Sequence, residues 1–172
     1  MKRASIAGIF TLGVMALGLM SQTAMSQQKS LKEQLVGTWT LVSWDQRNAD
    51  GTTVQLFGAN PKGIAFFDTT GHYIITVMRS DRAKYAIENF GQIAQTTAEE
   101  NKATAQGTIT YFGTYSVNEA DRVIAIHVEA SSFPNWNGTD QKRFFELTED
   151  QLKLIVRPRP GVSGDVLWKR AK

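Results

Sequence analysis

The sequence predicts an all-β fold, a single antiparallel up-and-down β-barrel of about eight to nine strands. From residue 38 onward, apolar and polar side chains alternate in short segments, which is the period of a strand with one buried face. Turn sequences rich in Gly, Asn and Asp separate many of these segments. The links are mostly short, and many short strands with short links are typical of an up-and-down barrel.

Residues 1–26 are expected to be an export signal and 27–172 the barrel domain. Lys2 and Arg3 form a basic start, residues 5–20 are apolar or small, and Ala24-Met25-Ser26 supplies small residues at a cleavage site. The apolar run is shorter than the roughly 20 residues of a spanning helix, although an uncleaved anchor remains an alternative. The protein is therefore expected to be periplasmic or secreted, without membrane attachment after cleavage.

Charge and cysteine content exclude several classes of partner. Lys2 and Arg3 are two of the 19 basic residues, which leaves 17 in the expected mature chain against 16 acidic residues. A nearly neutral domain has no electrostatic footprint for nucleic acid or an anionic membrane. The chain has no cysteine, so its core must form without disulfides. The sequence leaves the oligomeric state open.

A short N-terminal helix and nine strands are expected along the chain. The helix, at 31–36, begins with the capping box of Ser30 and Glu33. The strands are expected at 38–46, 53–57, 63–68, 72–78, 108–117, 123–130, 140–147, 151–157 and 165–170. The segment 158–164 is expected to be irregular because it contains Pro158, Pro160 and Gly161.

A helical insertion is expected near 80–106, where Ala, Glu, Gln and Lys are frequent. Thr97 and Glu100 form a second capping box, which predicts a helix at 97–106, with another turn near 82–90. Such a long connection in an all-β domain is usually functional, so we expect it to cover or plug the barrel mouth.

The side-chain alternation predicts which residues line the lumen. The inward set is expected to include Tyr73, Ile75, Val77, Tyr111, Tyr115 and Phe145. Trp39 is expected to pack at the closed end, with Arg170 or Lys169 over its ring, and a contact with the ligand is the alternative. Trp44 has the opposite parity and is expected to be a surface aromatic near the other end.

A polar cluster is expected inside the barrel. If strands 123–130 and 140–147 pair symmetrically about Asn135, His127 lies opposite Arg143, and His127, Glu129 and Arg143 share the lumen. The apolar pattern of 123–130 taken alone places His127 and Glu129 on the outer face. A shift of one residue in the strand register would also separate the cluster. A structural ion pair of Glu129 with Arg143 is the alternative to a ligand-orienting or acid/base site.

Two further residues are expected near the barrel rim. Arg79 follows a strand and can receive a carboxylate in bidentate fashion, although Asp81 starting a helical turn is the alternative. Trp136 belongs to an aromatic loop that either overhangs the mouth or is simply packed. No metal or cofactor is expected, because the histidines lack ligand spacing and no nucleotide-binding or nucleophile motif is present.

Several blocks, in this order, resemble the bacterial and fungal lipocalin-like domain family. They are Gly37–Trp44, Asn60–Gly63, Arg79–Arg82, Tyr111–Tyr115, His127–Glu129 and Pro134–Thr139, and together they span roughly 37–157. The resemblance implies a calycin-type barrel with a cavity for a hydrophobic ligand, and it implies no reaction. The export signal is a departure, since many relatives lack one, and makes an intracellular biosynthetic role less expected.

The expected function is an exported protein that binds a small apolar or amphipathic molecule in the barrel lumen. The expected ligand-binding residues are Tyr73, Arg79, Tyr111, Tyr115, His127, Glu129, Trp136, Arg143 and Phe145. One alternative is an isomerase, cyclase or dehydratase that uses His127 and Glu129 as acid and base. Another is a structural domain whose barrel is filled by its own side chains. Whether any reaction is catalysed is left open.

Overall fold

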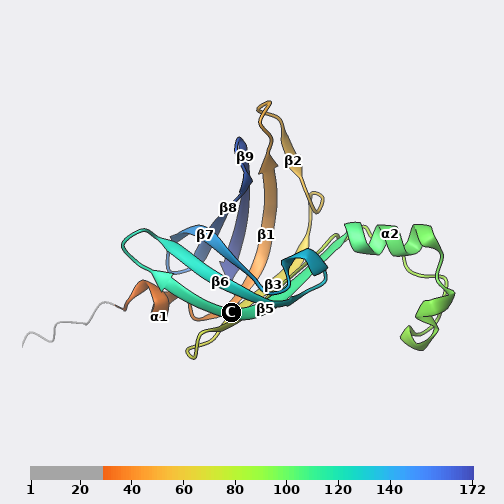
Figure 1. Ribbon diagram of the computed structural model, residues 1–172, viewed down its shortest axis with the longest axis horizontal. Coiled ribbons are helices and arrows are strands. Elements are labelled where there is room, and N and C mark those ends of the chain that lie inside the picture. The colour runs from red at the N-terminus through yellow and green to blue at the C-terminus, as the bar shows by residue number, and fades with distance from the viewer. Residues whose placement is uncertain (1–28) are drawn as a thin grey trace, which may run out of the picture.

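The computed structural model describes residues 29–172, and the expected export signal, 1–26, lies outside the described residues. One antiparallel sheet contains nine strands, of which eight close into a barrel in the order β1-β3-β4-β5-β6-β7-β8-β9 through the pairing of β1 with β9. The ninth, β2, pairs with the second half of β1 (Figure 1). The predicted fold class is confirmed. Between residues 29 and 172, no helix has the length and apolarity needed to cross a bilayer.

The elements lie close to their predicted positions. The helical elements are α1 (Leu31–Leu35), the 3-10 turns η1 (Phe90–Gln95) and η2 (Pro134–Trp136), and α2 (Ala98–Gln106). The strands are β1 (Gly37–Arg47), β2 (Thr53–Gln55), β3 (Lys62–Phe67), β4 (His72–Met78), β5 (Thr108–Asn118), β6 (Val123–Ser131), β7 (Thr139–Leu147), β8 (Gln151–Arg159) and β9 (Val162–Arg170).

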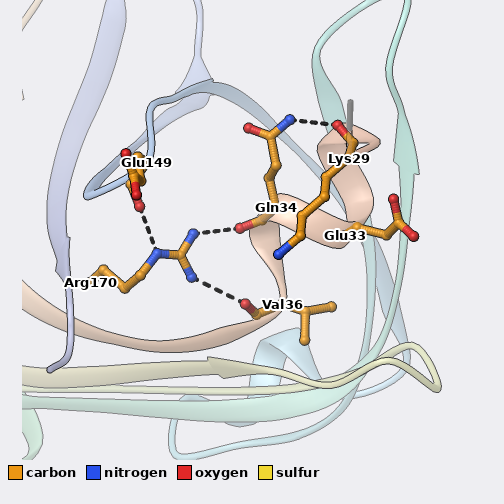
Figure 2. Close-up of a pocket in the computed structure, with 6 residues that line it drawn as sticks. All are labelled: Lys29, Glu33, Gln34, Val36, Glu149 and Arg170. Carbon is orange, nitrogen blue, oxygen red and sulfur yellow. Dashed lines mark hydrogen bonds between the residues drawn. The ribbon is translucent and has the colours of Figure 1, made fainter. Parts of the chain in front are cut away.

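One end of the barrel is closed by α1 and the last strand. The indole of Trp39 donates a 2.9 Å hydrogen bond to the carbonyl of Leu35. The guanidinium of Arg170 lies 4.1 Å from the centre of the Trp39 ring, as predicted. It also donates to the carbonyls of Gln34, Val36 and Glu149 at 2.6, 3.2 and 2.6 Å (Figure 2). This arginine therefore joins three chain segments at the closed end.

Large side chains fill the closed half of the barrel. Along β5, Tyr111 and Tyr115 share the buried inner face. The ring of Phe67 packs edge-on against Tyr115 with 5.2 Å between centres, and Tyr73 packs edge-on against Tyr111 at 5.9 Å. The other large buried side chains of the core include Trp39, Phe145 and Trp168. This part of the lumen is packed, as the filled-barrel alternative anticipated.

A β-bulge in β1 overturns the prediction for Trp44. The register with β9 shifts between Leu41 and Ser43, so the inward parity changes after the bulge. Trp39 and Leu41 are buried before it, and Trp44 is buried after it with 8% of its surface exposed. The prediction of a surface aromatic was wrong because periodicity assumes an uninterrupted strand.

The segment 158–164 was expected to be irregular, but it contains the end of β8, a turn at Pro160-Gly161 and the start of β9. The register shifts between Val156 and Arg159, which accommodates Pro158 without a regular ladder. Gly161 adopts a φ of +74°, the left-handed conformation that the turn requires. The breaker residues therefore shape a hairpin instead of ending the sheet early.

The helical insertion extends away from the barrel (Figure 1). The capping box at Thr97 and Glu100 is present and α2 confirms the predicted helix, whereas the turn expected near 82–90 lies at Phe90–Gln95. Neither helical element buries any side chain, and Phe90 is 83% exposed. The expected plug is absent from the described residues, and only the last turn of α2 reaches the mouth.

Candidate functional site

A cavity of about 530 Å³ opens at the end of the barrel opposite α1. Apolar side chains dominate its walls, and they come from strands, from the loop after β2, from the last turn of α2 and from η2. The residues that define it best are Trp44, Phe57, Ala105, Ile109, Trp136 and Val156. An apolar concavity of this size is typical of small-molecule sites.

Aromatic contacts hold the walls of this cavity. The bulge in β1 turns Trp44 inward, where its ring packs 5.1 Å from that of Phe57. Across the opening, Phe133 and Trp136 pack edge-on with 5.8 Å between ring centres. Trp136 sits in the single turn η2, which Pro134 begins and the Thr139 hydroxyl anchors by donating to the Trp136 carbonyl at 2.7 Å. Of the two arrangements considered for this aromatic loop, the structure has the one at the mouth, where Phe133, Pro134 and Trp136 line the cavity.

Most residues predicted to bind a ligand lie deeper than the cavity. Tyr73, Tyr111, Tyr115, Arg143 and Phe145 are all buried and belong to the barrel interior. None of these five residues lines the 530 Å³ cavity. Trp136, which was also predicted to bind the ligand, does line it. The inward orientation predicted for them is correct, but their rings fill the space they were expected to surround.

The three buried tyrosines differ in how their hydroxyls are satisfied. The Tyr115 hydroxyl donates a 2.6 Å hydrogen bond to the carbonyl of Asp68, whereas the Tyr73 hydroxyl is buried without a partner. Burial raises the pKa of all three above the ordinary value. For Tyr73, burial is the largest cause, the proximity of Tyr111 and Glu129 adds to it, and the charge of Arg143 opposes it. The interior therefore holds neutral phenols beside a guanidinium.

Arg143 is the charged residue buried in the described part of the chain, with 5% of its surface exposed. Its terminal nitrogens donate to the backbone carbonyl of Lys142 at 3.1 Å and to the side-chain carbonyl of Gln141, while its Nε has no partner. None of the ion pairs within residues 29–172 involves it. The expected ion pair with Glu129 is therefore not formed.

The prediction that His127 and Glu129 share the lumen with Arg143 is wrong. His127 pairs with Asp140 and Arg143 pairs with Ile124, a register shifted by three residues from the symmetric one. An odd shift moves a side chain to the other face of the sheet. His127 is exposed and lies 2.8 Å from the Asp140 carboxylate.

Glu129 is also exposed and occupies a β-bulge. The register of β5 with β6 shifts between Phe112 and Gly113, which leaves Glu129 without a cross-strand partner. A side chain on Gly113 would collide with the carbonyl of His127, so the absence of a Cβ permits this close approach of β5 and β6. The two strands β6 and β7 do pair in a constant register, but their hairpin is centred between Phe133 and Pro134 and not at Asn135.

Arg79, expected at the rim, is already engaged. Its guanidinium donates two hydrogen bonds to Asp81, from Nε at 2.9 Å and from Nη2 at 2.7 Å. This hydrogen bonding is the main cause that lowers the pKa of Asp81. The bidentate geometry predicted for a ligand carboxylate is thus used within the chain itself. Among residues 29–172, no three His, Cys, Asp or Glu side chains gather as metal ligands would.

The sequence analysis missed Trp44, Phe57 and Ala105 as walls of the cavity. The parity of β1 pointed Trp44 outward, and Phe57 lies just after β2 in a loop. Ala105 belongs to the last turn of a helix with no buried residue. A clue was the pair of Trp39 and Trp44 at odd spacing in one strand, since burying both requires a bulge.

Three solved structures resemble this one at low sequence identity. A redesigned β-barrel is 14% identical over 84% of this chain and 100% of its own (TM-score 0.43). A de novo designed fluorescence-activating β-barrel is 12% identical over 83% and 99% (TM-score 0.41). A mutant of the fluorescent protein UnaG is 10% identical over 81% and 97% (TM-score 0.38). No curated protein matches the chain.

The family assignment rests on a match over most of the chain. The model of the lipocalin-like domain family matches residues 36–169, which spans every strand of the barrel. The strand order, the closure of β1 onto β9 and the resemblance of the sequence blocks agree with it. The chain belongs to the lipocalin-like domain family.

Proposed function

We propose that this protein is exported and binds a small apolar or amphipathic molecule in the cavity at the barrel mouth. The observation that carries the proposal is the 530 Å³ apolar cavity lined by Trp44, Phe57 and Trp136. Burying apolar ligand surface stabilises a complex by roughly 25 cal/mol per Å², which can support micromolar affinity after the cost of association.

Binding can be tested with phenylnaphthylamine, a neutral probe whose fluorescence rises in apolar surroundings. We expect saturable enhancement by the wild-type protein. Ala105→Trp would fill the cavity from the exposed end of α2 and should weaken binding at least about tenfold, which corresponds to about 1.4 kcal/mol.

The matched control is Ala103→Trp. Ala103 is exposed on the same helix but does not line the cavity, so this variant adds the same ring without obstructing the site. It should bind the probe as the wild type does. Absence of saturable binding to the wild type would contradict the proposal, and equal weakening by both variants would show that the site lies elsewhere.

The export part of the proposal is supported by residues 1–26, with their basic start and apolar run. Expression of the full chain in a Gram-negative host should yield protein in the periplasm or medium whose N-terminus follows Ser26. A version lacking residues 2–26 should stay in the cytoplasm. A full-length product that retains Met1 to Ser26 after fractionation would contradict cleavage.

The alternative acid/base function is not carried forward. It required His127 and Glu129 inside the barrel, and both are exposed. The His127 ring is instead bonded to the Asp140 carboxylate on the outer surface.

A further inference from the structure

The strongest unexplained feature of the molecule is the buried guanidinium of Arg143. Removing an arginine from water costs several kcal/mol unless an anion and a full set of hydrogen bonds offset the loss. Within the described residues, Arg143 has no acidic partner, and its Nε has no acceptor. This arrangement is costly for the unliganded protein.

A second unpartnered polar group lies in the same region. The hydroxyl of Tyr73 is buried and has neither donor nor acceptor. The charge of Arg143 acts on the ionisation of both Tyr73 and Tyr111, so the two phenols lie within electrostatic reach of the guanidinium. A donor set of one guanidinium and a nearby phenol is suited to a carboxylate.

Trp136 connects this polar region to the mouth cavity. It lines the cavity, packs edge-on against Tyr111 with 5.3 Å between ring centres, and has the Arg143 guanidinium 6.0 Å from its own ring centre. It belongs to a single exposed turn, in which Pro134 and Asn135 are solvent-exposed. Its indole is held inward by contacts with Phe133, Tyr111 and Arg143, and moving it would open the cavity toward Arg143.

We propose that the ligand of the mouth cavity is an amphipathic molecule that carries a carboxylate. When this ligand binds, its carboxylate displaces the indole of Trp136 from its inward contacts and accepts hydrogen bonds from Arg143 and Tyr73. The apolar part of the ligand occupies the mouth cavity, against the walls formed by Trp44 and Phe57. This inference rests on the proposed binding function and specifies the charge class of the ligand and its orientation, with the acid innermost.

The test compares two probes that differ in the charge of one group, dansyl-aminoundecanoic acid and its uncharged methyl ester, which is larger by one methyl group. Hydrogen bonds to a charged group contribute roughly 1.5–3 kcal/mol, so the wild type should bind the acid about ten to a hundred times more tightly than the ester. Because the guanidinium is buried, raising salt from about 0.1 M to 1 M should reduce this preference little. A preference that came from exposed surface charges would largely disappear at the higher salt concentration.

Two variants test whether Arg143 and Tyr73 cause the preference for the acid over the ester. Arg143→Met should abolish the preference for the acid while leaving ester affinity within about threefold, and Tyr73→Phe should reduce only acid affinity, by about tenfold. Lys142→Met is the matched control, because Lys142 is exposed on the same strand. It should keep the full preference.

The outcomes separate this inference from the proposed function. Equal binding of acid and ester by the wild type would overturn the carboxylate inference and leave the cavity as an apolar binding site. Loss of the preference in Lys142→Met as well would place the charge effect on the surface and overturn the inference too. Failure of both probes and of phenylnaphthylamine to bind would overturn the proposed function, and the inference with it.

Discussion

Two arginines, one at the closed end and one inside the barrel, have opposite hydrogen-bonding environments. Arg170 donates to three backbone carbonyls and covers the ring of Trp39 (Figure 2). Arg143 is more deeply buried, yet among residues 29–172 its Nε lacks an acceptor and no carboxylate forms an ion pair with it. The first arrangement stabilises the unliganded fold. The second costs stability and therefore indicates a role that the unliganded fold does not use.

The largest loss of stability is expected at alkaline pH, where the buried tyrosines of the interior ionise. Three of the four tyrosines, Tyr73, Tyr111 and Tyr115, have pKa values raised mainly by burial. The stability contributed by their neutral forms is complete below the unfolded-state pKa near 10 and is lost as pH rises above it. Most of the tyrosinate absorbance should therefore appear together with loss of near-ultraviolet circular dichroism. Ionisation of all four while that signal persists would contradict their burial.

The next largest effect is expected for Arg170→Ala. It removes three hydrogen bonds and a cation–π contact at the closed end, so the free energy of unfolding should fall by about 3 kcal/mol. Urea denaturation measures this change. Lys169→Ala, at the exposed neighbouring position, should change stability by less than about 0.5 kcal/mol. Similar losses of unfolding free energy in both variants would contradict a specific role of Arg170 in stabilising the closed end.

Arg143→Met is expected to act in the opposite direction. Replacing an unpaired buried guanidinium by an apolar chain of similar length should leave unfolding free energy unchanged or raise it by about 1 kcal/mol. The same denaturation experiment measures it, without ligand. A loss comparable to that of Arg170→Ala would mean that Arg143 supports the fold and would break the contrast between the two arginines.

The smallest effect is expected for His127→Ala. The imidazole is 46% exposed and contacts a still more exposed Asp140, so the loss should stay within about 0.5 kcal/mol. Binding of phenylnaphthylamine should also be unchanged, because His127 does not line the cavity. A clear loss of probe binding would reopen its predicted luminal role.

Prediction from sequence succeeded where the local pattern is continuous. β4 was predicted at its observed bounds, because the Thr70-Gly71 turn marks its start and a mostly apolar run follows from His72 to Met78. The inward orientation of Arg143 and Phe145 was also correct. It failed for Trp44 and the 158–164 segment, which lie at a bulge or register shift, and for His127, because the β6–β7 hairpin is centred elsewhere than assumed. A single inserted residue moves the side chains that follow it to the opposite face of the sheet. Sequence periodicity contains no signal for where the insertion falls.

The sequence by itself determined the strands, the caps of α1 and α2, the family and the apolar character of the interior, because these follow from local alternation and residue type. Tertiary structure decided that aromatic rings fill the closed half, that the cavity lies at the mouth, and that Arg143 forms no ion pair within the described part of the chain. Those outcomes depend on register between distant strands and on how large side chains share a fixed volume, neither of which is a local property of the chain.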